Sequence, residues 1–162
     1  MNASELTLRF GKTRLHANVH WPRTDKGRLA LALTDELPRA DWLERDFVVV
    51  ALDGRDRRAD ELAALHWLGE HGGELCEGPS RLIVAGGARA AWLAVGARDS
   101  AWPMLDRQVI FHPRFGAANP LPSSVAGVAP ALVVRGGDGS DDGARYAALL
   151  RLAGVDVDEV RR

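Results

Sequence analysis

Residues 81–97 read RLIVAGGARAAWLAVGA, and this stretch decides the fold. Its first part, residues 81–85, is a short apolar run of the kind that forms a strand covered on both faces. Gly86-Gly87 predicts a tight turn, and the Ala-rich segment from about Ala88 onward predicts a helix. A buried strand that turns at once into a helix is the unit from which parallel sheets are built.

The same alternation of apolar runs and helical patterns continues along the chain. Further strands are predicted at 15–19, near a sheet edge, and at 29–33, 47–52, 109–111, 131–134 and 155–160. Helices are predicted at about 59–71 and 141–153, and the Pro- and Gly-rich segment 112–130 predicts a long loop. Residues 1–162 are therefore expected to form a single α/β domain. Its sheet should be mainly parallel, with about six or seven strands and helices on both faces.

The composition limits the classes of partner. The chain has 162 residues, 46% of them hydrophobic, and its 21 basic and 22 acidic side chains leave a net charge of −1. This balance gives no electrostatic reason to expect nucleic acid or a membrane as a partner. Cys76 is the only cysteine, so no disulfide can form within the chain. Because the N-terminus lacks the layout of a signal peptide and no apolar run approaches the roughly 20 residues of a membrane span, we expect a cytoplasmic protein.

The stretch that begins at residue 81 resembles the nucleophile elbow of α/β hydrolases, in particular that of the hormone-sensitive-lipase-like esterases. This family has a strand, then G-D-S-A-G-G, then an apolar helix that contains L-A. Gly86 matches the first glycine, Leu93-Ala94 matches the trailing pair, and Ala88 falls on the nucleophilic serine. The resemblance implies a strained turn that lifts position 88 above the sheet, beside N–H groups at the start of the helix. Since an alanine methyl group cannot form an acyl-enzyme, the resemblance covers the fold without the nucleophile.

A second resemblance to the same esterases lies nearer the C-terminus. Around the acid of its catalytic triad the family reads roughly P-x-L-V-V-x-G-x-x-D-P-L-x-D-E-G-x-x-Y-A-x-x-L-x-x-A-G-V. Residues 130–138 of this chain read PALVVRGGD, and DDG, YA, LL and AGV follow in the same order. Gly139-Ser140 stands where the family has Pro-Leu. The resemblance implies a remnant of the triad acid at or beside Asp138.

The oxyanion loop of the family is altered in this chain. Where the esterases carry His-Gly-Gly, this chain has Thr34-Asp35-Glu36-Leu37-Pro38. Two carboxylates at this place would repel a developing oxyanion, which the family stabilises with glycine N–H donors. Because the chain ends soon after its last predicted strand, we expect no loop for a triad histidine, and the short segment between the fifth and sixth strands of the family pattern predicts that the lid is missing. We therefore expect a minimal hydrolase-like core without a lid and without the catalytic serine and histidine.

Other residue types offer few alternatives for chemistry. Ser100 and Ser123-Ser124 are loop serines, which are usually solvated or capping residues. His66 and His71 are five residues apart rather than the four of a metal-binding pair on a helix, and His16 and His20, which are four apart, fall in a predicted strand, where they lie too far apart to hold one metal ion. Cys76 is expected to be a partly buried thiol, and no glycine-rich turn completes a nucleotide-binding motif. We expect no metal and no cofactor.

Ligands of an open parallel sheet bind beyond the carboxyl ends of its strands. Here those ends should bring Ala88 and Asp138 together with a charged rim, which consists of Asp35, Glu36, Asp53, Arg55, Arg89, His112 and Arg114. For such a pattern, a solvated rim of Arg–Asp pairs is a commoner outcome than a dedicated site.

The missing catalytic groups lead to two hypotheses. The first is a catalytically inactive α/β-hydrolase-like protein that acts by binding, either as a homo-oligomer, to a protein partner, or to a small polar ligand. Five tryptophans, among them Trp92 and Trp102, fit an exposed interface and a core equally well. The alternative is an enzyme, either a small carboxylesterase-like hydrolase or an acid–base lyase or isomerase that uses Asp35, His112 and Asp138.

Overall fold

The computed structural model describes residues 2–10, 12–23, 27–37, 41–53, 58–76, 81–136 and 139–162. Its strands are β1 (Asn2–Phe10), β2 (Thr13–Trp21), β3 (Arg28–Leu33), β4 (Val48–Leu52), β5 (Arg81–Gly86), β6 (Arg107–Phe111), β7 (Ala131–Arg135) and β8 (Val157–Arg161). Its helices are α1 (Asp41–Asp46), α2 (Arg58–His71), α3 (Ala88–Asp99) and α4 (Asp142–Leu152), with the 3-10 turns η1 (Thr34–Glu36) and η2 (Gly72–Glu74).

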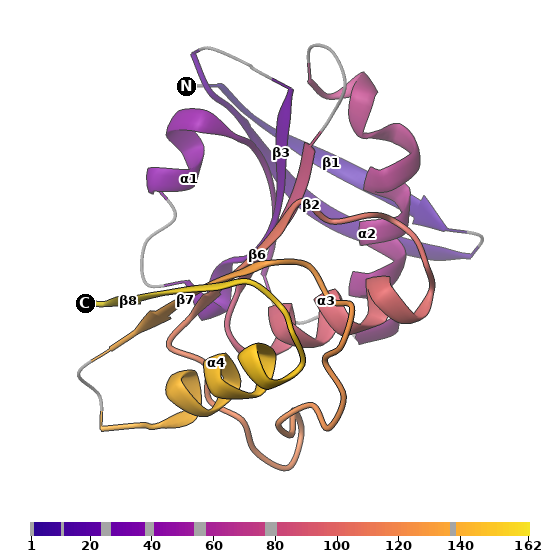
Figure 1. Cartoon of the computed structure of the whole chain (residues 1–162). Helices are drawn as coiled ribbons and strands as arrows, with labels where there is room; N and C mark the ends of the chain where they lie inside the picture. The colour runs from indigo at the N-terminus through magenta and orange to yellow at the C-terminus, as the bar shows by residue number, and fades with distance from the viewer. Residues whose placement is uncertain are drawn as a thin grey trace.

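The eight strands of the described residues form one sheet in the order β1-β2-β4-β3-β5-β6-β7-β8 (Figure 1). The pairs β1–β2 and β2–β4 are antiparallel, and all later neighbours are parallel. This order confirms the predicted α/β fold with a mainly parallel sheet, and every predicted strand is present. The sequence prediction missed the edge strand β1, in which residues 5–9 alternate polar and apolar, and the short helix α1.

Strands β3, β4 and β5 lie in the middle of the sheet and are buried on both faces. Every residue of β4 is buried, and in β3 and β5 only the first residue is exposed. This position explains why their sequences are continuous apolar runs rather than alternating ones. Each fully buried Val or Leu side chain contributes about 1.5–3 kcal/mol, so these strands fix the frame on which the site is built.

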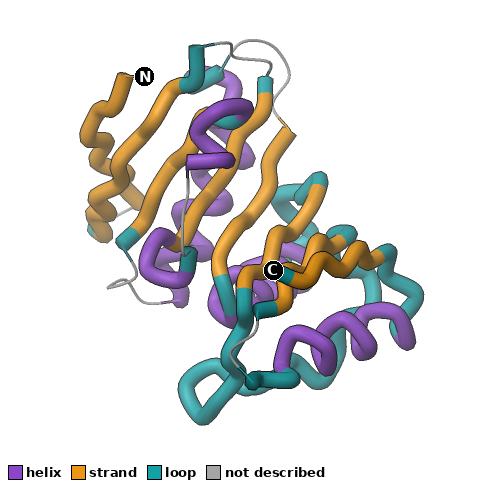
Figure 2. Tube along the Cα trace, turned by 90° about the vertical axis from the view of Figure 1, so that its left-hand side faces the viewer, coloured by secondary structure: helices purple, strands orange, loops and turns teal. Residues whose placement is uncertain are grey.

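Helices cover both faces of the sheet, as predicted, but the two faces differ. One core lies between the sheet and the helices α2, α3 and α4, and it includes Leu65, Leu93 and Tyr146. A smaller core on the opposite face includes Leu43 of α1, with Trp42 packed against it. Figure 2 views the sheet from this second face, where α1 is the one helix of the described residues that packs on the strands.

Helix α3 follows β5 directly and packs closely on α2. Alanine has the highest helix propensity, and most of the Ala side chains of α3 are buried against the sheet and α2. A Cβ on Gly96 would lie 3.0 Å from Cδ1 of Leu62, so this glycine permits the close approach of the two helices. The packing fixes the first turn of α3 at the carboxyl ends of β3 and β5. No helix in the described ranges is long and apolar enough to cross a membrane.

Candidate functional site

Ala88 begins α3 directly after the glycine turn. Gly87 has φ −100° and ψ −131°, and Ala88 is 3% exposed. Among the described residues, Ala101 and His112 are the non-glycine residues with a positive φ, so Ala88 does not adopt the left-handed conformation. The strained elbow that the resemblance implied is therefore not formed at Ala88.

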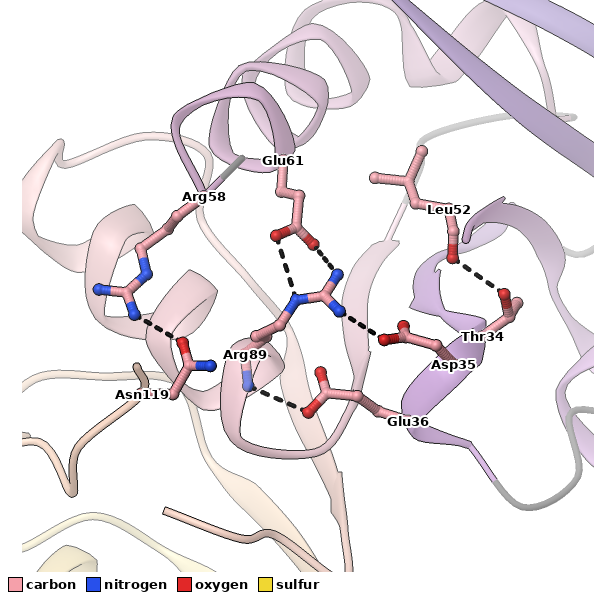
Figure 3. A network of polar contacts seen from close by, with 8 residues as sticks. All are labelled: Thr34, Asp35, Glu36, Leu52, Arg58, Glu61, Arg89 and Asn119. Carbon is pink, nitrogen blue, oxygen red and sulfur yellow. Dashed lines mark hydrogen bonds and ion pairs between the residues drawn. The ribbon is translucent and has the colours of Figure 1, made fainter. Parts of the chain in front are cut away.

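The carboxylate of Glu36 lies at the N-terminus of α3 (Figure 3). Its Oε2 accepts a hydrogen bond from the backbone N–H of Arg89 at 3.3 Å. In α/β hydrolases, the N–H of the residue after the nucleophile is one of the oxyanion donors. In this chain the corresponding donor is the N–H of Arg89, and it already donates to the carboxylate of Glu36. The positive end of the helix dipole also favours a negative group at this place.

Gly87 leaves the room that this carboxylate needs. A Cβ on Gly87 would lie 2.5 Å from Oε2 of Glu36, which is too close for two atoms that are not bonded. The esterase pattern has aspartate at the position of Gly87 and glycine in the oxyanion loop, whereas this chain has glycine at 87 and glutamate at 36. An aspartate side chain at 87 would fill the space of the Glu36 carboxylate, so the two differences belong together sterically.

Arg89 joins three elements through its guanidinium (Figure 3). Its Nη2 lies 2.5 Å from Oε2 of Glu61 in α2, and its Nε donates to the other oxygen of Glu61 at 3.3 Å. Its Nη1 lies 2.6 Å from Oδ2 of Asp35 in η1. Thr34 anchors η1, because its hydroxyl donates to the carbonyl of Leu52 at the end of β4 at 2.9 Å. We refer to Asp35, Glu36, Glu61 and Arg89 as the Arg89 cluster.

The Arg89 cluster sets three carboxylates against one guanidinium. Burial raises the pKa of Glu36, and the N–H and charge of Arg89 oppose this effect only in part, while the charge of Asp35 adds to it. Burial alone would lower the pKa of Arg89, but the hydrogen bonds and charge of Glu61, with the charge of Asp35, outweigh burial and raise it. Oε1 of Glu36 is buried without a hydrogen-bond partner in the described part of the chain. Glu36 is thus the least well satisfied carboxylate of the cluster.

Hydrogen bonds from Arg58 and Trp92 attach the long loop 112–130 to the helices beside the Arg89 cluster. Nη2 of Arg58 donates to Oδ1 of Asn119 at 2.6 Å (Figure 3). The Arg58 guanidinium also lies 4.6 Å from the ring centroid of Trp92. Nε1 of Trp92 donates to the carbonyl of Pro120 at 2.7 Å. Trp92 therefore holds the loop, whereas Trp102 is 47% exposed.

The other predicted rim residues do not belong to the Arg89 cluster. Asp53 and Arg114 are exposed. The ring of His112 packs against Gly136, where a Cβ would overlap it. No hydrogen bond or ion pair joins His112 to Asp35 within the described residues. Arg55 and Asp138 lie outside the described residues, so their places in the rim stay predictions.

Sequence reasoning placed Asp35, Glu36 and Arg89 in one rim but missed Glu61, which is 2% exposed. Glu61 shares the buried stripe of α2 with Ala64, Leu65 and Leu68. These positions follow the 3.6-residue period of a helix face that points into the core. A charged residue on such a stripe needs a partner, and this is the signal that identifies it from sequence.

Two further expectations concern cysteine and metal ions. Cys76 is 8% exposed, and its Sγ donates to the carbonyl of Gly72 at 3.3 Å, so the thiol that was expected to be partly buried is buried. No group of three or more His, Cys, Asp or Glu side chains is placed to hold a metal ion in the described ranges.

Comparison by sequence finds esterases. No family model matches the chain. Carboxylesterase NlhH of Mycobacterium tuberculosis, from strains CDC 1551 / Oshkosh and ATCC 25618 / H37Rv, is 30% identical over 139 residues. The match covers 70% of this chain and 44% of the relative, so the chain spans less than half the length of the curated relatives it matches.

Comparison by structure finds the same class of protein. The hyperthermophilic esterase of Pyrobaculum calidifontis matches with a TM-score of 0.80 at 20% identity, over 99% of this chain and 75% of the other. The carboxylesterase EstE1, cloned from a metagenomic library, matches with a TM-score of 0.77 at 20% identity, over 99% of this chain and 78% of the other. The homologues and structural neighbours of this chain are thus α/β-hydrolase esterases. The fold that the resemblance implied is therefore confirmed.

Proposed function

We propose that this protein is a catalytically inactive α/β-hydrolase-like protein that acts by binding. The observation that carries the proposal is the contact of the Glu36 carboxylate with the Arg89 N–H, beside an alanine at position 88. A serine hydrolase needs a hydroxyl at the elbow and a free N–H group for the oxyanion. In this chain the methyl group of Ala88 stands in place of the hydroxyl, and the Glu36 carboxylate accepts a hydrogen bond from the N–H of Arg89.

The two differences act on separate parts of the reaction. Loss of the hydroxyl removes the acyl-enzyme route altogether. Loss of a single oxyanion donor lowers kcat by about 100- to 1,000-fold in a serine hydrolase, and the negative charge of Glu36 would repel the oxyanion as well. A serine restored at position 88 would therefore still face an occupied oxyanion site.

The alternative is a small carboxylesterase-like hydrolase, with which the esterase relatives are compatible, or an acid–base lyase or isomerase. It would use Asp35, His112 and Asp138. Asp35 is engaged by Arg89 at 2.6 Å, and His112 packs against Gly136. These contacts give the alternative less support than the occupied N–H gives the inactive protein.

A panel of activated and simple esters tests the proposal on the purified chain. We expect wild type and Ala88→Ser to release product at the rate of buffer. Ala97→Ser, a buried Ala-to-Ser change in the last turn of the same helix, is the matched control. Turnover by wild type that disappears in His112→Ala or Asp138→Ala would overturn the proposal and establish the alternative.

A further inference from the structure

A groove of about 740 Å³ lies on the second face of the sheet, the face that carries α1. Apolar side chains form its floor, among them Trp42, Phe47 and Leu132. Six charged side chains line it, and they define what we call the amino-end groove: Arg28, Arg81, Asp106, Arg107, Asp156 and Asp158.

The amino-end groove lies at the opposite end of the strands from Ala88. Arg28, Arg81 and Arg107 are the first residues of β3, β5 and β6. Asp106 and Asp156 directly precede β6 and β8. The charged residues therefore form a row along the amino ends of neighbouring parallel strands, and none of them belongs to the Arg89 cluster.

The charges of this row are balanced and only partly used within the chain. Arg107 pairs with Asp158 at 3.4 Å, where both side chains are largely exposed. The Arg28 guanidinium lies 5.8 Å from the ring centroid of Phe47. Arg81 and Asp106 are exposed and form no ion pair within the described residues. The groove thus offers both signs of charge to a partner, in equal number.

We propose that the amino-end groove is the contact surface of a homodimer, in which a second copy of this chain covers it across a two-fold axis. An isologous interface must be complementary to itself, and a row of three arginines and three aspartates meets this condition. A partner of one charge sign would be repelled by half of the row.

This proposal rests on residues other than those of the proposed function. Loss of dimerisation would leave the ester panel unchanged, and turnover of an ester would leave the oligomeric state unchanged. The two proposals therefore fail separately.

Sedimentation velocity of the full chain over a micromolar concentration series tests the dimer. Asp106→Arg with Asp156→Arg makes the groove mostly basic and leaves Asp158 as its acidic side chain, and Arg28→Asp with Arg81→Asp makes it mostly acidic and leaves Arg107 as its basic one. We expect wild type to form a dimer and each double variant to weaken self-association by at least ~100-fold, since like charges repel across the interface. An equimolar mixture of the two double variants should form the dimer again, because their grooves then carry opposite charge.

The matched control is Glu70→Arg with Glu74→Arg, which changes the net charge as much at exposed positions of α2 and η2. It should associate like wild type. Circular dichroism confirms folding of each variant, and the neutral single variants Arg81→Gln and Asp106→Asn replace any double variant that fails to fold. A wild-type chain that stays monomeric throughout, or groove variants that associate as wild type does, would overturn the proposal.

Discussion

The charged side chains at the two ends of the parallel strands differ in how far they are exposed to solvent. At the carboxyl ends, Arg89 is only 17% exposed and binds Glu61, which is 2% exposed, with Asp35 and Glu36 around them. At the amino ends, Arg107 is 46% exposed and pairs with Asp158 at 3.4 Å. At the carboxyl ends the arginine and its main partner are buried, while at the amino ends the charged side chains are exposed to the surface.

This difference changes where a functional surface should be sought. In open α/β sheets, ligands bind beyond the carboxyl ends of the strands. In this protein the first turn of α3, which would face such a ligand, holds the Glu36 carboxylate instead. The α/β-hydrolase fold is thus retained, and at the end of the sheet where ligands usually bind, a carboxylate of the chain itself contacts the Arg89 N–H. The following variants test how strongly the side chains at that end are bound to one another.

Arg89→Ala should have the largest effect, because it removes the guanidinium that binds both oxygens of the buried Glu61 carboxylate. We expect a loss of about 3–5 kcal/mol in the free energy of unfolding, the usual cost of breaking a buried ion pair. Urea denaturation measures this loss. Arg107→Ala is the matched variant at the amino end and should cost less than about 1 kcal/mol, because its ion pair is exposed.

Asp35→Asn tests the ion pair of Arg89 with Asp35 separately from its ion pair with Glu61. The Asp35 side chain is 41% exposed, so its pair with Arg89 should contribute no more than about 1 kcal/mol, less at high salt. If Arg89→Ala cost no more than Asp35→Asn or Arg107→Ala, the side chains at the carboxyl end would be bound no more strongly than those at the amino end, and the comparison would fail.

Gly87→Ala should have the next largest effect. Its Cβ would displace the Glu36 carboxylate from the α3 N-terminus, and overpacking of this kind costs about 1–3 kcal/mol. Glu36→Ala removes the group that is displaced, so most of the cost should vanish when Gly87→Ala is made in that background. A double-mutant cycle by urea denaturation measures this coupling. Additive effects of the two changes would show that Glu36 and Gly87 are not in contact.

Much of this arrangement can be predicted from the sequence because local patterns determine it. The central strands are continuous apolar runs, and residues 81–97 place the elbow at the end of one of them. Since residues 34–36 and 87–89 follow neighbouring parallel strands, the approach of Asp35 and Glu36 to Arg89 follows from the fold. The direction of the Glu36 carboxylate does not, because it depends on the space that Gly87 leaves.

The features that escaped prediction depend on tertiary pairing. Helix α1 has six residues, too few to show a periodic pattern. The charged residues of the amino-end groove are spread from Arg28 to Asp158, and only the register of the parallel strands from β3 through β5, β6 and β7 to β8 brings them into one row. No local pattern marks such a row, whereas the buried position of Glu61 on the α2 face is visible in the helical period.

Glu36→Gln should have the smallest effect and the most informative one, because it depends on pH. Burial raises the pKa of Glu36 in the folded protein above its ordinary value of 4.5. The folded chain then holds this proton more tightly than the unfolded chain, so the contribution of Glu36 to stability falls as pH rises from 4.5 through the raised pKa. Glutamine keeps an acceptor for the Arg89 N–H but does not titrate. The stability of Glu36→Gln relative to wild type should therefore increase over this pH range and then level off, as measured by urea denaturation at a series of pH values. The exposed variant Glu74→Gln should show no such trend. A relative stability that falls with pH would mean that the pKa of Glu36 is lowered in the folded protein, because the Arg89 N–H and guanidinium then outweigh its burial.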